Sequence, residues 1–428
     1  MTFYRKTTLP GGLRVITEEI PYVRSVSVGV WVGAGSCLET TANMGISHVI
    51  EHMLFKGTER RTARQIAQAI DGRGGTLNAF TSKEHTCYYA KVLDEHMEVA
   101  FDLLSDMLLH SRIAPDDLER EKGVIVEEIK MYEDVPDDLV HDLFAAAIWR
   151  DHALGRPIVG TADTVQGLDR EALLGYMAQT YRPENIVIAV AGHVQHDRVV
   201  EEVARTFGGL VAEGPVAPWP EPPAALQGSL GVLRPKEIEQ THLVLGTRGL
   251  HQDHDQIYAL HLMNTILGGG TSSRLFQEIR EQRGLAYSVY SYNSGFKGTG
   301  NFGVYAGVSP RAVGPVLDMI LALMEEVGRQ GVTPEELGEA KEQLKGQIML
   351  GLESTSSRMT RLGRGELSLG RVQSPDEIIA QIDRVTLAEV HDLARRLLLE
   401  EPRVLATVGP MPADVNLADY GFLEVQHG

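Results

Sequence analysis

Two segments near the start of the chain carry apolar residues in alternation or in short runs. They are "LRVITEEI" and "SVSVGVWVGAG", and Pro21 separates them. Alternation with a period of two predicts strands. Helical spacing of apolar residues instead predicts helices over residues 44–56, 62–71 and 96–111. Between the last two, "GGTLNAFTSKEHTCYYAKV" predicts a turn followed by strands.

The segment "APDDLEREKGVIVEEIKMYEDV" predicts a further helix. It places Pro115 in an N1-like position and acidic residues in the first turn. "NIVIAVAGHV", residues 185–194, predicts a strand that ends in glycine. Helices and strands therefore mix without a strict βαβ alternation. This predicts an α+β fold with mostly antiparallel sheets covered by helices.

A boundary is predicted at residues 209–229, "GLVAEGPVAPWPEPPAALQGS". This segment holds five prolines and no apolar periodicity, which is typical of a stiff linker. The sequence after it repeats the sequence before it, in the same order and at a nearly constant offset. The matched pairs are "HVIEHMLFKGT" with "HLMNTILGGGT", "APDDLEREKGVIVEEI" with "TPEELGEAKEQLKGQI", and "NIVIAVAGHV" with "PRVLATVGPM". We therefore expect two tandem homologous domains, 1–208 and 230–428.

The composition limits the function classes. The 428 residues carry a formal net charge of −18, which argues against a nucleic-acid partner, because phosphate binding needs a basic face. Two cysteines, Cys37 and Cys87, give no disulfide framework and suit a reducing compartment. No apolar run reaches the length that spans a bilayer, and the first residues lack the apolar core of a signal peptide. We expect a cytoplasmic protein with no membrane partner.

His48, Glu51 and His52 form the pattern H-x-x-E-H. On a helix, residues three and four apart share a face, so these three side chains project together. Two neutral imidazoles at this spacing can bind one zinc ion, and the carboxylate beside them can take a proton from a metal-bound water. The order is the inverse of the common H-E-x-x-H zinc-protease signature and is a known motif in its own right. The alternative interpretation of the motif alone is a surface helix with solvated His and Glu side chains.

A catalytic zinc needs a third protein ligand. Glu121 and Glu128 lie seven residues apart, which is two helical turns, so they share a face of their predicted helix. A buried carboxylate needs a partner, and a metal ion is one. The alternative is that both belong to a solvated acidic face, and their position alone does not decide between the two.

The repeat separates these alternatives. The positions with candidate chemistry differ together in the second half, whereas the apolar positions are kept. Glu51, His52, Glu121 and Glu128 align with Asn264, Thr265, Ala340 and Gln347. One half is therefore predicted to bind the metal, and the other half to provide the same scaffold without it.

Further motifs carry a resemblance to a known family. They are "HVIEH", "GGTLNAFTSKEHTCYY", "EREKGVIVEEI" and, in the second half, "LGGGTSSRLFQEIREQRGLAYSVYSYNSGF". Over nearly its whole length the chain resembles the pitrilysin/insulinase family of zinc peptidases. Within that family it is most similar to the bacterial processing proteases and to the beta subunit of the mitochondrial processing peptidase. The resemblance implies a zinc-dependent metalloendopeptidase that cleaves extended peptides or presequence-like segments.

The resemblance also implies roles for individual residues. In the family pattern the third ligand follows the second histidine by 76 residues, and Glu128 lies at that distance from His52. One zinc ion per chain would then be bound by His48, His52 and Glu128. Glu51 would be the general base, and Glu121 would be an acid that supports the site.

Substrate-binding residues follow from the same resemblance. Asn78, Ala79 and Phe80 match the strand along which an extended peptide is expected to add through main-chain hydrogen bonds. Arg280 and Tyr287 match a pair that contacts the substrate backbone and assists the catalytic half. Considered without the resemblance, these two are a solvated charge and a strand residue.

Two chains are expected to act together. The family encloses its substrate with four homologous domains and this chain supplies two, so a homodimer, or a heterodimer with a homologous chain, completes the set. The alternative from another class is a non-catalytic structural or peptide-binding subunit, since such members keep the fold. They lose parts of H-x-x-E-H or the distal Glu, whereas this sequence keeps them all. A zinc hydrolase for other substrates is a third alternative, which the strand motif disfavours.

Overall fold

The computed structural model of the chain describes residues 3–211, 217–422 and 424–427. These residues form two compact units, each built from three segments of sequence. Unit 1 comprises Met1–Lys130, Arg156–Pro220 and Leu350–Ser374, and unit 2 comprises Met131–Gly155, Glu221–Met349 and Pro375–Gly428. Of the predicted linker, residues 212–216 lie outside the described residues, and 217–229 contain no helix or strand.

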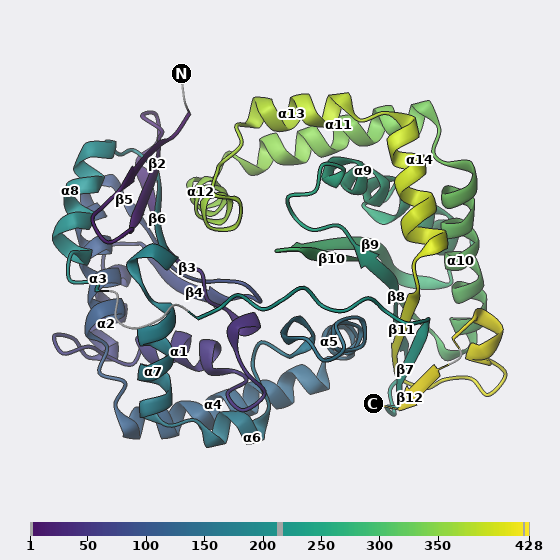
Figure 1. Cartoon of the computed structure of the whole chain (residues 1–428), viewed down its shortest axis with the longest axis horizontal. Helices are drawn as coiled ribbons and strands as arrows, with labels where there is room; N and C mark the ends of the chain where they lie inside the picture. Colours follow the sequence, from purple (N-terminus) through teal and green to yellow (C-terminus); the bar gives the residue numbers. More distant parts are fainter. Residues whose placement is uncertain (1–2, 212–216, 423, 428) are drawn as a thin grey trace. The chain divides into compact units, whose positions relative to one another are not determined.

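Unit 1 contains a six-stranded sheet. Its strands are β1 (Arg5–Thr8), β2 (Arg14–Glu19), β3 (Ser25–Val32), β4 (Thr76–Thr81), β5 (Thr86–Leu93) and β6 (Ile186–Gly192). They lie in the order β1-β2-β6-β3-β5-β4, so β4 is at one edge (Figure 1). β2 and β6 are parallel and the other neighbours are antiparallel, as expected for a mostly antiparallel sheet.

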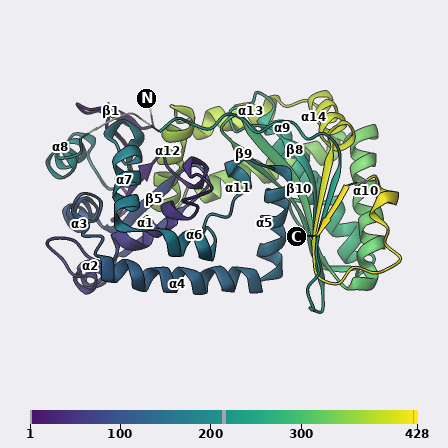
Figure 2. The same cartoon turned by 60° about the horizontal axis from the view of Figure 1, so that its bottom comes forward.

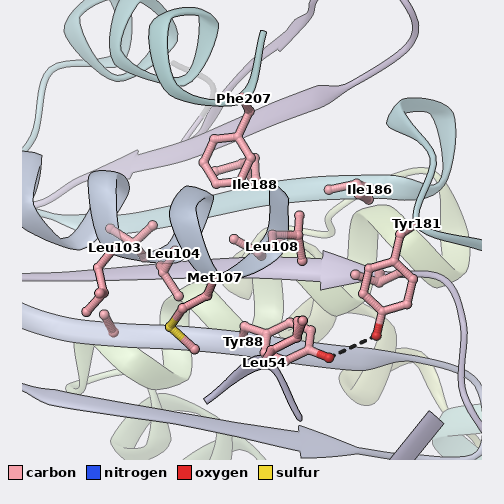
Figure 3. Packing of buried hydrophobic residues seen from close by; sticks show 14 of the residues in the cluster. Leu54, Tyr88, Leu103, Leu104, Met107, Leu108, Tyr181, Ile186, Ile188 and Phe207 are labelled. Atoms are coloured by element: carbon pink, nitrogen blue, oxygen red, sulfur yellow. Dashed lines mark hydrogen bonds between the residues drawn. The ribbon is translucent and has the colours of Figure 1, made fainter. Parts of the chain in front are cut away.

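Helices from the first half of the chain cover one face of this sheet. They are α1 (Ile46–Leu54), α2 (Ala63–Asp71), α3 (Met97–His110), α7 (Arg170–Thr180) and α8 (His196–Phe207). Alternate strand residues such as Ile186 and Ile188 point into this core, where Leu104 of α3 packs (Figure 3). The hydroxyls of Tyr88 and Tyr181 share a buried hydrogen bond of 2.9 Å there. Helices α4 (Pro115–Asp134) and α6 (Ala162–Gly167) follow α3 along the chain.

The opposite face of the unit 1 sheet is covered by α12 (Thr355–Leu369), which comes from the second half of the sequence (Figure 1). The Trp31 Nε1–H group donates a hydrogen bond of 3.3 Å to Met359 Sδ. Gly363 permits this close packing, because a Cβ atom at that position would overlap the Trp31 ring. With helices on both faces, β6 is buried at every position, which explains its continuous apolar run.

Unit 2 repeats this arrangement. Its strands are β7 (Leu230–Arg234), β8 (Thr241–Gly249), β9 (Ala286–Phe296), β10 (Thr299–Val308), β11 (Arg403–Val408) and β12 (Glu424–His427). Their order, β12-β7-β11-β8-β10-β9, corresponds to that of unit 1 when β12 is set against β1, although β12 is parallel to β7 whereas β1 is antiparallel to β2. β7 pairs in parallel with β11, as β2 does with β6. The predicted α+β class and the predicted duplication are confirmed.

The helices of unit 2 follow the same plan. One face of the sheet is covered by α9 (Ile257–Gly268), α10 (Val313–Gln330) and α14 (Leu387–Arg395), and α11 (Pro334–Gly351) and α13 (Pro375–Arg384) complete the unit. The other face is covered by α5 (Pro136–Ile148), from the first half of the chain. Phe144 of α5 packs so closely on β8 that a Cβ atom at Gly246 would lie 2.6 Å from its ring.

Each sheet therefore receives one covering helix from the other half of the sequence. The predicted boundaries, 1–208 and 230–428, follow the sequence repeat, whereas the compact units exchange α5 and α12. The exchange buries the second face of each sheet, which an antiparallel sheet can otherwise leave to solvent. Across the described residues, we find no helix with the length and apolar character needed to cross a membrane.

Candidate metal centre

Helix α1 carries both histidines of H-x-x-E-H. Its apolar residues Val49, Ile50 and Met53 are buried in the core of unit 1, which leaves another side of the helix for polar residues. His48 and His52 lie one turn apart on that side, and the centroids of their rings are 4.6 Å apart. The four-residue spacing therefore brings the two imidazoles together.

Helix α4 places a carboxylate opposite the two imidazoles. Figure 2 shows α4 as one long helix. Glu128 Oε1 lies 3.8 Å from His48 Nε2, and Glu128 Oε2 lies 3.7 Å from His52 Nε2. One ligand atom from each residue lies within 4.8 Å of the other two, and the described residues contain no other such group of His, Cys, Asp and Glu side chains.

Glu121, two turns before Glu128 on α4, contacts His52 from the other side of the ring. His52 Nδ1 lies 3.1 Å from Glu121 Oε2. Because a carboxylate oxygen accepts hydrogen bonds, the Nδ1–H group of His52 is the donor. The lone pair of Nε2 is then directed at Glu128. Lys56 Nζ lies 2.6 Å from the second Glu121 oxygen. Glu121 therefore orients His52 and does not join the cluster itself. Lys56 is not among the predicted site residues; it follows His52 by four residues and lies just beyond the end of α1.

The three clustered side chains fit a zinc ion in number, type and spacing. Ligands about 2 Å from a tetrahedral metal lie roughly 3.3 Å from one another, close to the separations at Glu128. Burial lowers the pKa of His48 to about 4, with a further contribution from His52, so the His48 imidazole is neutral at pH 7. Imidazole lone pairs that face a carboxylate repel it, and a cation among them removes the repulsion. A divalent metal would complete this donor set.

Glu51 lies beside the cluster on α1. Its Oε2 atom accepts a hydrogen bond of 2.5 Å from the hydroxyl of Thr81, the last residue of β4. Burial raises the pKa of Glu51; the Thr81 hydrogen bond and His52 lower it in part, and Glu128 adds to the rise. A carboxylate with a raised pKa is a suitable proton acceptor. Thr81 is absent from the predicted site residues; its position directly after "NAF" places it at the end of the predicted strand, but the sequence does not show its contact with Glu51.

Strand β4 contains Asn78, Ala79 and Phe80. It is the edge strand next to β5, and such an edge offers N–H and C=O groups to an added strand. The Ala79 N–H group donates to Asn78 Oδ1 over 2.9 Å. Phe80 is 36% exposed, and its ring meets that of Trp31 edge-on, with centroids 5.6 Å apart. The three predicted residues therefore lie on a strand that is open on one side.

Arg280 and Tyr287 lie together in unit 2. Arg280 is in the π-helical segment η5 (Phe276–Glu281), and Tyr287 is in β9, the edge strand of the second sheet. The guanidinium carbon lies 5.1 Å from the centroid of the Tyr287 ring and 4.8 Å from that of the Phe276 ring. Tyr287 is 78% exposed, so its phenol is open to solvent.

Helices α9 and α11 of unit 2 correspond to α1 and α4. Among the described residues, they carry no comparable cluster of His, Cys, Asp and Glu side chains. His261 of α9 is half-buried, and its Nδ1 atom lies 3.3 Å from the side-chain amide of Asn293. The Thr265 hydroxyl donates to the His261 carbonyl over 2.9 Å. The aligned positions thus serve packing and local hydrogen bonding in this unit.

Known families match both halves of the chain. The family described as "Insulinase (Peptidase family M16)" matches residues 14–162, and the one described as "Peptidase M16 inactive domain" matches residues 167–344. This chain belongs to peptidase family M16. The resemblance to the insulinase group is thereby confirmed, and an M16 domain described as inactive corresponds to much of the half without the histidine cluster.

M16 relatives match over almost the whole chain. "Uncharacterized zinc protease YmxG" of Bacillus subtilis is 46% identical over 406 residues, which cover 95% of this chain and 98% of the relative. "Uncharacterized zinc protease SCO5738" of Streptomyces coelicolor is 46% identical over 412 residues, which cover 95% and 90%. These names support a peptidase that uses zinc.

Solved M16-like structures share the fold. A protease from Helicobacter pylori superposes with a TM-score of 0.91 at 22% identity, covering 95% of this chain and 99% of that one. A structure from Pseudomonas fluorescens, described as a peptidase M16 inactive domain, gives a TM-score of 0.89 at 22% identity, covering 96% and 99%. At this identity the likeness concerns the fold alone.

Proposed function

We propose that this chain is a zinc-dependent metalloendopeptidase that binds one zinc ion through His48, His52 and Glu128. The observation that supports this most directly is the convergence of both Nε2 atoms on the Glu128 carboxylate, with Glu51 beside them. A catalytic zinc site has three protein ligands and one position open to water. The side chains of His52 and Glu128 are partly exposed, so solvent reaches the cluster.

The chain's own side chains provide proton transfer and orientation. When bound, zinc supplies a Lewis acid for the scissile carbonyl and lowers the pKa of a coordinated water. Glu51 accepts a proton from the attacking water and donates it to the leaving amine. Thr81 engages one Glu51 oxygen, which leaves the other oxygen for the proton. Glu121 holds the His52 ring in the orientation that directs Nε2 at the metal.

The proposed substrates are extended peptides or presequence-like segments that add to β4 as a further strand. Pairing with the main chain of Asn78, Ala79 and Phe80 fixes the peptide along this edge. The scissile bond then lies near Glu51, because Thr81 of the same strand contacts that carboxylate. Rotation of the Asn78 side chain frees the Ala79 N–H group for the peptide.

Unit 2 is proposed to assist substrate binding and catalysis. The exposed Tyr287 phenol and the Arg280 guanidinium beside it are donors suited to peptide carbonyls and to a developing oxyanion. We also propose that two copies of the chain associate, since a second copy would bring the number of homologous domains to four. Light scattering tests this, and a particle of twice the chain mass is expected.

Metal analysis combined with cleavage of a mixed peptide library tests the proposed activity. We expect one zinc equivalent per chain and cleavage that a chelator abolishes and added zinc restores. Absence of metal, together with absence of chelator-sensitive cleavage, would favour a non-catalytic structural or peptide-binding subunit of the same fold.

A further inference from the structure

A buried carboxylate, Glu39, contacts the first turn of α1. Its Oε2 atom accepts a hydrogen bond of 2.7 Å from the Gly45 N–H group, and its Oε1 atom accepts one of 2.9 Å from the Ser47 N–H group. Only 4% of Glu39 is exposed. Both carboxylate oxygens are therefore used by the backbone of the helix that carries His48, the residue after Ser47.

Helix α1 depends on this contact because it has no side-chain cap of its own. Gly45, the residue before the helix, has a φ of 89° and no side chain that can accept hydrogen bonds from the first turn. The helix is only nine residues long, so the N–H groups of its first turn are a large share of its backbone donors. A carboxylate at this end also interacts favourably with the helix dipole.

Glu39 is itself held firmly. Its carbonyl oxygen accepts a hydrogen bond of 2.6 Å from Arg156 Nη1. The Ser47 hydroxyl, next to the carboxylate, lies 3.0 Å from the Tyr176 hydroxyl. Burial raises the pKa of Glu39 to about 7, against the opposing effects of the two backbone N–H groups, the Ser47 hydroxyl and Lys83. The carboxylate thus occupies a place where an ionised group is costly, and it is stabilised there by the start of α1.

We propose that Glu39 is a positioning residue of the metal centre. It fixes the start of α1 and, through the helix backbone, the places of His48 and Glu51 relative to Glu128 on α4. This inference rests on the proposed function, because it concerns residues assigned there to zinc and to the proton. Glu39 acts through Gly45 and Ser47 and has no part in the proton transfer itself.

The test compares Glu39→Gln with the wild-type chain at pH 8, where the carboxylate is ionised. Gln keeps the shape but presents an NH₂ group to one of the two backbone donors, so one hydrogen bond and the charge are lost. The zinc dissociation constant, measured by competition with a chromogenic chelator, should rise about tenfold, as when a supporting partner is removed from other metal sites. The kcat should fall by a similar factor while KM stays within about twofold, because β4 is untouched.

Two further variants separate positioning from general destabilisation. Glu39→Asp keeps the charge with a shorter side chain, so its zinc affinity and kcat should lie between those of Glu39→Gln and the wild type. If Glu39→Gln does not fold, Glu39→Asp takes its place in the comparison. Val203→Ala removes buried volume from α8, which packs on α3 and β2, and should lower the thermal midpoint without changing zinc affinity or kcat.

The outcomes are distinct. Wild-type zinc affinity and kcat in Glu39→Gln would overturn the positioning role while leaving the proposed function intact. The role is also overturned if Val203→Ala loses zinc affinity as strongly as Glu39→Gln. A wild-type chain that binds no zinc would overturn the proposed function, and this inference with it.

Discussion

The Thr81 hydroxyl donates a hydrogen bond of 2.5 Å to the Glu51 carboxylate. This contact joins the edge strand β4 to helix α1, and so joins the proposed place of the substrate to the proposed general base. It also lowers the pKa of Glu51, which burial raises. One hydroxyl therefore influences both where the carboxylate lies and how readily it takes a proton.

Replacement of Thr81 by Val removes this hydrogen bond and keeps the shape of the side chain. A hydrogen bond to a charged group contributes about 1.5–3 kcal/mol, so kcat is expected to fall by roughly tenfold or more. Zinc content should not change. Thr81→Ser keeps the hydroxyl and should retain most of the activity in the same steady-state assay. An equal kcat for the Val variant and the wild type would show that the contact is irrelevant to catalysis.

Replacement of Glu121 by Gln removes the charge that pairs with His52 and Lys56. Outer partners of metal-bound histidines typically contribute 10–100-fold to metal affinity, so zinc should dissociate at least about tenfold more readily. The matched control is Glu127→Gln on the same helix, because Glu127 is exposed and pairs with Lys130 at the surface. Chelator competition measures both variants. Equal losses in the two would contradict the role of Glu121.

The close contact between α12 and β3 predicts a strong effect on stability at Gly363. A Cβ atom there overlaps the Trp31 ring, and overpacking of this kind costs about 1–3 kcal/mol. Gly363→Ala should therefore lower the midpoint of thermal unfolding. Gly338→Ala in α11 is the control, because nothing lies within 4 Å of its added methyl group and Ala favours the helix by about 1 kcal/mol. A fall in both midpoints would argue against specific packing of α12.

The half-buried His85 predicts a loss of stability in mild acid. Burial and, second, Arg364 lower its pKa to about 4, whereas the unfolded chain has a histidine pKa of about 6.5. The unfolded state therefore binds the proton first. The stability that depends on neutral His85 is complete above pH 6.5 and is lost as the pH falls toward 4.

The matched variant is His85→Gln, which cannot titrate. Between pH 7.5 and pH 5, the wild type should lose about 2 kcal/mol of unfolding free energy more than this variant does. Urea unfolding at the two pH values gives the difference. Parallel losses in the two chains would exclude His85 as the titrating group.

Local patterns were sufficient for much of the fold and part of the site. The spacing of His48, Glu51 and His52 places them on one face because helix geometry acts over four residues. Glu128 lies far along the chain, and its helical spacing makes it a candidate ligand together with Glu121; the resemblance to a known family is what distinguishes the two. Its opposition to the two imidazoles depends on how α4 packs against α1.

Other contacts are invisible to such patterns. Thr81, Lys56 and Glu39 are ordinary polar residues in the sequence, and their partners are defined by tertiary packing. Sequence patterns also do not reveal the exchange of α5 and α12. An amphipathic pattern shows that a helix has a buried face, but it does not show which sheet that face covers. Helices cover both faces of each sheet, and the sequence pattern does not show which helix covers which face.

Glu51→Gln tests the central claim most directly, because it removes the proton acceptor and leaves the three proposed ligands in place. Turnover of a peptide that the wild type cleaves should fall to background, by about 10²-fold or more, while one zinc ion per chain remains bound. A Glu51→Gln chain that holds zinc and still cleaves this peptide at the wild-type rate would contradict the account.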